Sequence, residues 1–520
     1  MDRQVLPPLG NTLAQIFITM QFCSGSTAHR DLVFLWPLRM SNAAMGHADA
    51  YRRTYLEDWI AILRRLLRRR VGILSGPRWS IDSEPIRKIG RVVLSRHHWK
   101  ARVLLWAAAI GVGVAAVAFA RLADLALLGL DKILSFSLWW PWLTAPFGFA
   151  TIAYLTRRFF RGAEGSGIPQ TIFALRSDSG DAGARLLRPH VVLGRIFLAA
   201  GSLLCGGSIG REGPTVHVGA LIAHAVGRWM PHGTLGAPRR ALILAGGAAG
   251  VAAAFNTPLA GVVFAIEELS KSFEERASGV TLTAVILAGV VAIALVGDYT
   301  YFGQPIVTDR VSPFGLVTWC VAIGSGIAGG LFSRVTLASV GRLPGALGRL
   351  RRQRPALFAG LCGVIVAALG SVSAGHTYGS GYTQARSILE AHAHLPWFYA
   401  PLRASATLVS YLSGIPAGIL APSLSVGAGI GQSIADWFGA GTVPFAILGM
   451  CGYLAGVTQA PLTALVIVME MTSQHAMVLP LMITAVVATA ISRLLSPPLY
   501  QTLALRYAEP ASPAASAVAQ

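Results

Sequence analysis

Three short motifs that combine glycine and proline are the parts of this sequence best suited to bind an anion. They read GSGIP at 165–169, GREGP at 210–214 and GILAP at 418–422, and each proline opens an apolar segment. Proline suits the first turn of a helix, where its missing N–H would have no partner, and glycines before it expose the backbone amides. A helix start carries unpaired N–H donors and about half a positive charge, so it attracts anions. Three such starts predict a dehydrated anion pathway, although any single motif could equally be an ordinary turn between helices.

Glu212 is the ionisable residue placed within the second motif, where its charged neighbour is Arg211. A charged group inside a membrane segment is costly to bury and usually marks function. When ionised, the carboxylate could occupy the place of an anion at the helix start, and when protonated it would leave that place. Glu212 is therefore predicted to be a gate and a proton carrier. The alternative is a surface turn in which Arg211 and Glu212 pair.

Glu267 and Glu268 end an apolar segment that begins near Thr257. Because further charged residues follow, these two glutamates indicate the water-facing end of a helix, with a proton-transfer role as the alternative. Gly246, Gly247 and Gly250 lack the GxGxxG spacing of a dinucleotide-binding turn, no GxxxxGK[ST] or HExxH motif occurs, and the five cysteines lie far apart without a CxxC pair. We therefore expect neither an enzyme nor a bound cofactor or metal, and no disulfide framework.

The elements that must position these residues are membrane helices. Of the 520 residues, 54% are hydrophobic and only 13% are charged, whereas soluble domains are about a quarter charged. The uncharged stretches Val103–Ala120 and Ile133–Thr156 are long enough to cross a bilayer, which takes about 20 residues. Between Ala404 and Tyr500, prolines and glycines interrupt the apolar segments, which predicts re-entrant or broken helices lining a cavity. The fold class is therefore an all-α polytopic membrane protein.

The net charge of +20 is concentrated in clusters of arginine beside the apolar stretches. These clusters are Arg64, Arg65, Arg68, Arg69 and Arg70, then Arg157, Arg158 and Arg161, and finally Arg349, Arg351, Arg352 and Arg354. Clusters in such places mark cytoplasmic segments by the positive-inside rule. No nucleic-acid partner is expected, although a nucleic-acid binder tethered through the basic N-terminal region is the alternative from another class.

An internal repeat relates the two halves of the chain. GREGPTVHVGA at 210–220 aligns without gaps to GILAPSLSVGA at 418–428, and TPLAGVVFAIE at 257–267 aligns to APLTALVIVME at 460–470. The two offsets, 208 and 203 residues, are similar and the order is the same. Duplication therefore predicts two similar halves with a substrate site near the middle of the membrane, formed by paired broken helices.

Longer stretches of the sequence resemble the CLC family of chloride channels and transporters. GSGIP and GREGP occur here as they do in that family, and GILAP stands where the family has GxFxP, with Leu420 replacing the phenylalanine. The similarity continues through LAGGAAGVAAAFNTPLAGVVFAIEEL at 244–269, QAPLTALVIVMEMTSQHAMVLP at 459–480 and PPLYQTLALR at 497–506. It covers roughly residues 100 to 506.

The resemblance implies a CLC-type inverted internal repeat of broken and tilted helices, assembled as a homodimer with one anion pathway per subunit. It assigns two hydroxyls and two backbone amides to the anion site, those of Ser166, Tyr500, Ile419 and Leu420. Glu212 matches the external gating glutamate of the family, and Glu268 matches the internal proton-transfer glutamate of its exchangers.

The function that the resemblance implies is secondary active exchange of chloride for protons across the lipid bilayer. A passive chloride channel, gated by voltage or pH on the same fold, is the alternative. Family channels commonly lack an acid at the place of Glu268, so its presence favours exchange, and Ser166 fits chloride selectivity. Some relatives carry acids just after GSGIP, where this chain has Gln170 and Thr171. The route by which protons reach Glu268 therefore stays open.

The predicted organisation has three parts. Residues 1–99 form a basic cytoplasmic segment, residues 100–506 form the transmembrane domain with repeat halves at about 100–300 and 310–506, and residues 507–520 form a short tail. The chain ends 20 residues after Tyr500, which is too soon for the paired cytoplasmic CBS domains of many eukaryotic members. We therefore expect a multi-pass protein of a bacterial inner membrane with its N-terminus in the cytoplasm.

Overall fold

The computed structural model describes residues 96–507, except for 138, 178–179, 231–238, 271–274, 298–300, 306, 308–310, 342, 344 and 391–392. The chain separates into two compact units, Met1–Leu94 and Ser95–Gln520, and the described residues belong to the second. The predictions for the basic N-terminal segment therefore lie outside the described residues. Among the described residues every regular element is a helix, which confirms the all-α class.

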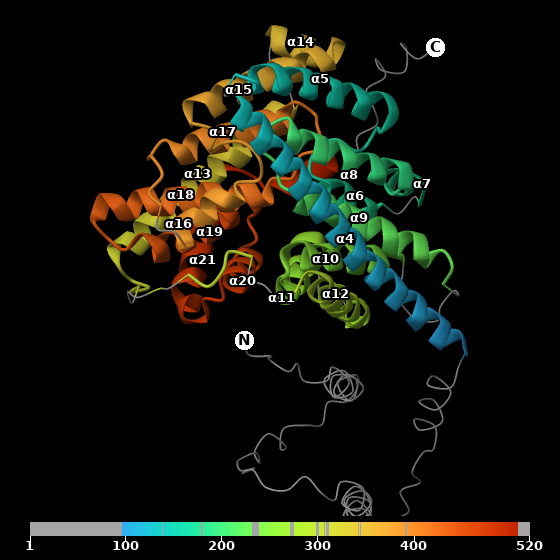
Figure 1. Cartoon of the computed structure of the whole chain (residues 1–520). Helices are drawn as coiled ribbons and strands as arrows, with labels where there is room; N and C mark the ends of the chain where they lie inside the picture. Colours follow the sequence, from blue (N-terminus) through green and yellow to red (C-terminus); the bar gives the residue numbers. More distant parts are fainter. Residues whose placement is uncertain are drawn as a thin grey trace, which may run out of the picture. The chain divides into compact units, whose positions relative to one another are not determined.

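The first half of the unit runs from the long helix α4 to α12 (Figure 1). Its helices are α4 (Arg96–Phe136), α5 (Pro141–Phe159), α6 (Ile168–Arg176), α7 (Gly180–Leu186), α8 (Pro189–Leu204), α9 (Glu212–Gly227), α10 (Arg239–Phe255), α11 (Pro258–Phe264), the π-helical turn η1 (Ala265–Ser270) and α12 (Glu275–Val296). Several of these helices are short, as the predicted broken segments require.

The second half repeats this pattern of long and short helices. Its members are α13 (Leu316–Gly341), α14 (Gly345–Gln353), α15 (Pro355–Val372), α16 (Tyr382–Glu390), α17 (Tyr399–Leu412), α18 (Leu420–Phe438), α19 (Thr442–Thr458), α20 (Pro461–Thr472), the 3-10 turn η2 (His475–Met477), α21 (Val478–Leu495) and α22 (Leu499–Leu505). Helices α5, α6, α8, α11, α15 and α20 each carry a proline in the first turn, where it costs no hydrogen bond.

Five helical stretches in the described part are long and apolar enough to cross a membrane. They are Trp99–Phe136, Gly279–Val296, Leu316–Gly341, Pro355–Val372 and His475–Leu495. The predicted crossing Val103–Ala120 lies inside the first of them. The prediction of one crossing over Ile133–Thr156 was wrong, because α4 continues to Phe136 and Pro141 opens a separate helix. The absence of charged residues from a stretch does not show where one helix ends and the next begins.

The internal repeat is visible in how two pairs of helices pack. In the first half, Gly219 of α9 meets Gly246 of α10 so closely that a methyl group on either would overlap the carbonyl oxygen of the other. In the second half, Gly427 of α18 and Gly449 of α19 touch in the same reciprocal way. Gly219 and Gly427 are aligned in the first pair of segments, and Gly246 and Gly449 are 203 residues apart, the offset of the second pair. We therefore conclude that the two pairs of helices pack in the same way in both halves.

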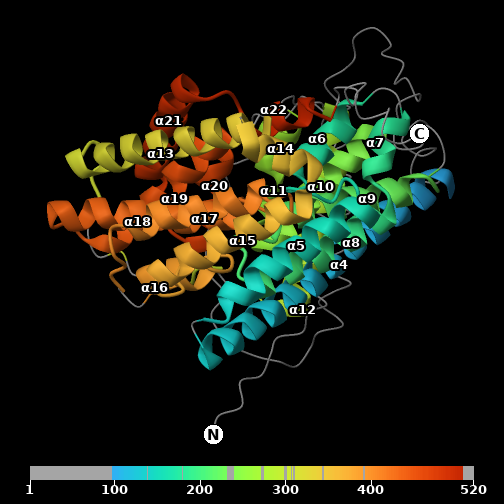
Figure 2. The ribbon, with the colours of Figure 1, turned by 90° about the horizontal axis from the view of Figure 1, so that it is seen from above.

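The two halves lie side by side within this unit (Figure 2). Helices α4 to α12 gather on one side and α13 to α21 on the other, and α5 packs against α15 between them. Further contacts cross from one half to the other: α18 meets α9, α20 meets α11 and η1, and the last helix, α22, lies against α6. The boundary between the halves is therefore where the predicted site residues come together.

Candidate anion and proton site

The three glycine-proline motifs meet through backbone hydrogen bonds. The Gly165 N–H donates to the Ile415 carbonyl (3.2 Å), and the Ala417 N–H donates back to the Gly165 carbonyl (3.0 Å). The Gly210 N–H donates to the Gly418 carbonyl at 2.7 Å. The loop before α18 thus pairs with the loop before α6 and with the loop before α9. Three helix starts that lie far apart in the sequence are brought to one place.

Two glycines make this convergence possible. A methyl group on Gly213 would lie 2.5 Å from the Ser166 carbonyl oxygen, and one on Gly418 would overlap the Gly210 carbonyl. Gly167, which precedes α6, has a φ of +96°, in the left-handed region that other residues rarely adopt. Gly213 and Gly418 therefore let two backbone segments approach each other closely, and Gly167 allows the sharp turn before α6.

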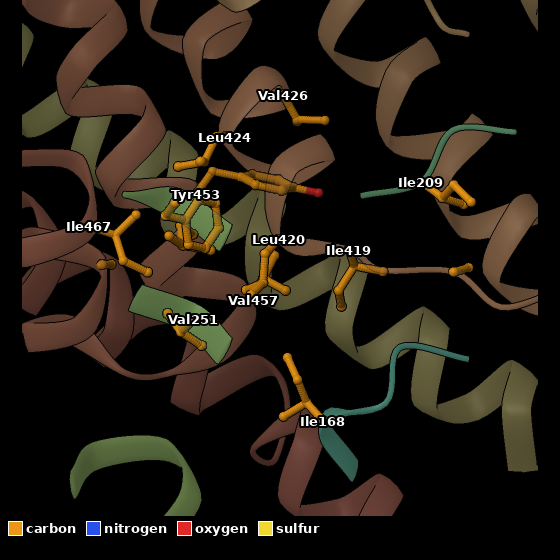
Figure 3. Close-up of a cluster of buried hydrophobic side chains, with 14 of the residues drawn as sticks. Ile168, Ile209, Val251, Ile419, Leu420, Leu424, Val426, Tyr453, Val457 and Ile467 are labelled. Carbon is orange, nitrogen blue, oxygen red and sulfur yellow. The ribbon is translucent and has the colours of Figure 1, made fainter. Parts of the chain in front are cut away.

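Apolar, buried side chains line the place where the motifs meet. Figure 3 shows the side chains of Ile168, Ile209 and Ile419, one beside each motif, as members of a single buried cluster. Ile419 precedes the first turn of α18 and Leu420 begins that turn, and both are buried. The first N–H groups of a helix have no carbonyl partner within it, so the start of α18 offers donors in a site of low polarity. Leu420 keeps this wall apolar without the phenylalanine expected from the resemblance.

Ser166 and Tyr500, the predicted hydroxyl ligands, are fully buried. The Ser166 hydroxyl accepts a hydrogen bond from the Ile168 N–H (3.3 Å), while its own proton remains available to an anion. Tyr500 lies on α22, which packs against α6, and its hydroxyl has no hydrogen-bond partner among the residues that the structure describes. A buried hydroxyl without a partner costs free energy, so a ligand that accepts its proton would be favoured.

Glu212 is fully buried in the first turn of α9. The backbone N–H groups of Arg211, Ala421 and Glu212 itself face its carboxylate. None of these N–H groups makes a hydrogen bond of standard geometry, since both carboxylate oxygens lack one within the described part of the chain. Ala421 belongs to the first turn of α18, so the carboxylate lies near the starts of two helices. That position is the one predicted for a carboxylate that takes the place of an anion.

The alternative interpretation of Glu212, a surface turn paired with Arg211, was wrong. The Arg211 side chain donates instead to the Asp124 carboxylate on α4 at 2.8 Å, and to the Ala120 carbonyl at 3.1 Å. Burial of Glu212 and the distant partner of Arg211 exclude an exposed ion pair between these two neighbours.

Glu268 is only 2% exposed, so the interpretation of both glutamates as a water-facing helix end was wrong for this residue. It lies in the π-helical turn η1, which follows α11 and contacts α6. The Gln501 side-chain amide donates to the Glu268 carbonyl at 2.6 Å, which joins η1 to α22 next to Tyr500. Glu212 and Glu268 both lie close enough to the Tyr500 hydroxyl for their charges to act on it. All three of these predicted groups are buried.

Glu267 and Glu470 make a reciprocal connection between the two halves that was not predicted from the sequence. The Glu267 carboxylate accepts from the N–H groups of Leu462 (3.2 Å) and Thr463 (2.6 Å), at the start of α20. The Glu470 carboxylate accepts from the N–H groups of Leu259 (3.2 Å) and Ala260 (2.7 Å), at the start of α11. Glu267 therefore caps α20, which carries Glu470, and Glu470 caps α11, which continues directly into the η1 turn that carries Glu267.

Glu267→Gln and Glu470→Gln are each expected to lower the free energy of unfolding by about 1–2 kcal/mol, because a neutral amide replaces a carboxylate at a helix start. Thermal unfolding in detergent measures the effect. Glu390→Gln is the matched control, since Glu390 pairs with Arg386 one helical turn away on the surface and such pairs contribute about 0.3–0.5 kcal/mol. Melting temperatures equal to that of the control would show that the caps do not stabilise the fold.

Arg195 is a fully buried cation that holds the loop of the first motif. Its guanidinium donates to the carbonyls of Gly165 (3.0 Å), Gly162 (2.7 Å) and Glu164 (3.3 Å). The Gly165 carbonyl also accepts from the Ala417 N–H, so Arg195 supports the junction between two motifs. A positive charge in this dry site also favours an anion nearby.

Arg403 repeats this arrangement in the second half. It is also fully buried, and it donates to the carbonyls of His376 (3.2 Å), Tyr378 (2.9 Å) and Gly379 (2.7 Å). Gly379 opens another Gly-Ser-Gly sequence, at 379–381, whose two glycines have positive φ like those at 165 and 167. The separation of Arg195 and Arg403, 208 residues, equals the offset of the aligned motifs, and that signal could have identified both arginines.

The comparisons with known proteins agree with this geometry. The model of the family described as voltage gated chloride channel, Voltage_CLC, matches residues 147–493. The H(+)/Cl(-) exchange transporter ClcA of Cronobacter sakazakii is 32% identical over 461 residues, which cover 80% of this chain and 92% of that protein. The ClcA of Yersinia pestis is 31% identical over 451 residues, covering 80% of this chain and 90% of its own length.

Two solved structures are also similar. The structure of a slow cyanobacterial Cl⁻/H⁺ antiporter is 25% identical, with a TM-score of 0.67, and covers 78% of this chain and 98% of that one. A CLC-type fluoride/proton antiporter is 22% identical with a TM-score of 0.66, covering 77% of this chain and 96% of that one, and it supports the fold alone.

Proposed function

Because the chain belongs to the CLC family of voltage gated chloride channels, we propose that it is a secondary active transporter that exchanges chloride for protons. The observation that carries this proposal is the buried Glu212 carboxylate at the starts of α9 and α18. A group that is an anion in one protonation state and neutral in the other can link the two substrates at one place. The relatives named as H(+)/Cl(-) exchange transporters support the same assignment.

The chloride ion is held, in this proposal, by the hydroxyls of Ser166 and Tyr500 and by the amides of Ile419 and Leu420. All four residues are buried, so the ion exchanges its water shell for fixed donors. Protonation of Glu212 removes the competing negative charge and admits chloride, and deprotonation returns the carboxylate to the start of α18. No cofactor is required, because chloride and protons are themselves the substrates.

Glu268 supplies the proton route from the other side of the site. It is buried next to Tyr500, through the bond from Gln501, and lies on η1 in contact with α6. Gln501 also accepts a hydrogen bond from the exposed Arg176 guanidinium, so a chain of polar groups leads from the surface to the backbone of Glu268. The guanidinium and the carboxamide do not exchange protons near neutral pH, so these hydrogen bonds fix the position of Glu268 and carry no protons to it.

The protein is a multi-pass membrane protein. We further propose that it acts as a homodimer, with the bacterial inner membrane as its location and its N-terminus in the cytoplasm. Leu259 of α11 and Leu462 of α20 occupy equivalent positions of the repeat, and they are 59% and 53% exposed. Paired apolar exposure of this kind suits a symmetric subunit interface as well as lipid.

The reversal potential of the current in planar bilayers distinguishes exchange from a passive channel. With a fixed chloride gradient, an exchanger is expected to shift its reversal potential when a pH gradient is imposed, because both ions carry the charge. A chloride channel would keep the chloride Nernst potential at every pH gradient, and that result would contradict the proposal.

A further inference from the structure

A pocket of about 430 Å³ is lined by α4, α10, α12 and the neighbouring loops. Arg211, Arg121, Asp124, Asn256 and Tyr301 are among the residues that line it. We call this cavity the Arg211 pocket. Arg211 immediately precedes Glu212, so the residue next to the gate is part of the lining of this pocket. An anion that reaches the gate through this pocket meets the Arg211 guanidinium first.

The cationic end of the Arg211 pocket is built around one guanidinium. The Tyr301 ring lies beneath it, with 5.9 Å between the ring centroid and the guanidinium carbon. The guanidinium also donates to the Ala120 carbonyl at 3.1 Å, so both α4 and the aromatic ring fix its position. Arg211 is mostly buried, with 14% of its side chain exposed. The positive charge is therefore presented to the pocket in one orientation.

The Arg211 guanidinium already forms an ion pair with a carboxylate of the protein. Asp124 Oδ1 lies 2.8 Å from Arg211 Nη1, and the Asp124 side chain is 51% exposed toward solvent. An ion pair with one exposed partner is weak, because water solvates the carboxylate and salt screens the attraction. Chloride arriving in the pocket can therefore displace Asp124, but it has to compete with it.

We propose that the Arg211 pocket is a binding site for small monovalent anions, and that Asp124 occupies it as an intramolecular competitor that sets the apparent affinity for chloride. The inference rests on the proposed function for the identity of the anion. It differs from that function because it concerns how tightly an anion is captured before the gate and assigns no role in proton coupling. Arg121 adds a second positive charge to the lining, so Asp124 is the single negatively charged residue among the charged residues that line the pocket.

Asp124→Asn is the direct test. The amide keeps the shape of the side chain but removes the negative charge, so chloride is expected to half-saturate exchange in proteoliposomes at a concentration about two- to fivefold lower, the range of a weak ion pair. Chloride concentration is varied at constant ionic strength with a large impermeant anion. The difference is expected to shrink as ionic strength rises. Asp124→Glu, which restores the charge, should return the half-saturating concentration toward that of the wild type.

Asp131→Asn is the matched control. Asp131 lies two turns further along α4, is exposed, and is not part of the lining of the Arg211 pocket. Its substitution changes the net charge equally and is expected to leave the half-saturating concentration unchanged. An equal shift in both variants, or none in Asp124→Asn, would overturn the inference.

Calorimetric titration of chloride into the detergent-solubilised variants separates this inference from the proposed function. Tighter binding in Asp124→Asn than in Asp131→Asn supports the competitor even if the wild type moves no protons. If the two variants bind chloride with equal affinity while the wild type exchanges chloride for protons, Asp124 is not a competitor for chloride and the proposed function stands.

Discussion

Glu212→Gln protein in liposomes is expected to pass chloride while carrying no protons. Glutamine has the shape of the protonated glutamic acid, but it cannot release a proton and cannot return to the start of α18 as an anion. Glu212 is fully buried, so an acidic side chain at the protein surface cannot take over its role in proton transfer. Proton movement driven by a chloride gradient should fall to that of protein-free liposomes, and chloride flux should persist.

The control for this experiment is Glu390→Gln, which makes the same chemical change in a surface ion pair on α16. Its coupled proton movement is expected to match that of the wild type. Normal coupling in Glu212→Gln would show that the proton does not pass through this carboxyl group. Loss of both fluxes in Glu212→Gln would show that the carboxyl group is needed for the structure of the pathway.

Arg195→Met is expected to lower the free energy of unfolding by about 3 kcal/mol and to weaken chloride binding. Three carbonyls would lose a charged donor, and hydrogen bonds to charged groups contribute about 1.5–3 kcal/mol each, partly offset because no charge is buried any longer. The loop that carries Ser166 would also lose its support. Thermal unfolding in detergent and calorimetric titration with chloride measure the two effects.

Arg403→Met is the matched control, because Arg403 is equally buried and also donates to three carbonyls. Its loop supplies no predicted anion ligand, so a similar loss of stability with a smaller loss of chloride affinity is expected. Arg195→Lys, which keeps the charge, should retain part of the affinity. Equal losses of chloride affinity in Arg195→Met and Arg403→Met would mean that Arg195 acts only on the fold.

Features that depend on local chemistry could be predicted from the sequence. The three motifs could be recognised as helix starts because proline and glycine have few other uses in that order, and Glu212 stood out because charge is rare in membrane segments. The repeat could be found because Gly219 and Gly427 must both be glycine for two helices to touch. In each case the local constraint restricts which type of residue can occupy the position, so the residue type reveals it.

Features that depend on distant partners could not be predicted. Glu267 and Glu268 are adjacent and chemically identical, yet one caps α20 and the other is buried beside α22. Which of them is buried depends on the π-helical turn and on a helix about 200 residues later in the chain. The pairing of Arg211 with Asp124 likewise crosses 87 residues, and a glutamate adjacent in sequence suggested the wrong partner.

Movement of protons against their own gradient is the measurement that tests the central claim most directly. Purified protein is reconstituted into liposomes with equal pH on both sides and a chloride gradient as the driving force, and the external pH is followed. The account predicts that chloride flow in one direction drives protons in the other, building a pH gradient that a protonophore dissipates. Chloride flow with no change in pH would contradict exchange and would make the protein a passive chloride channel.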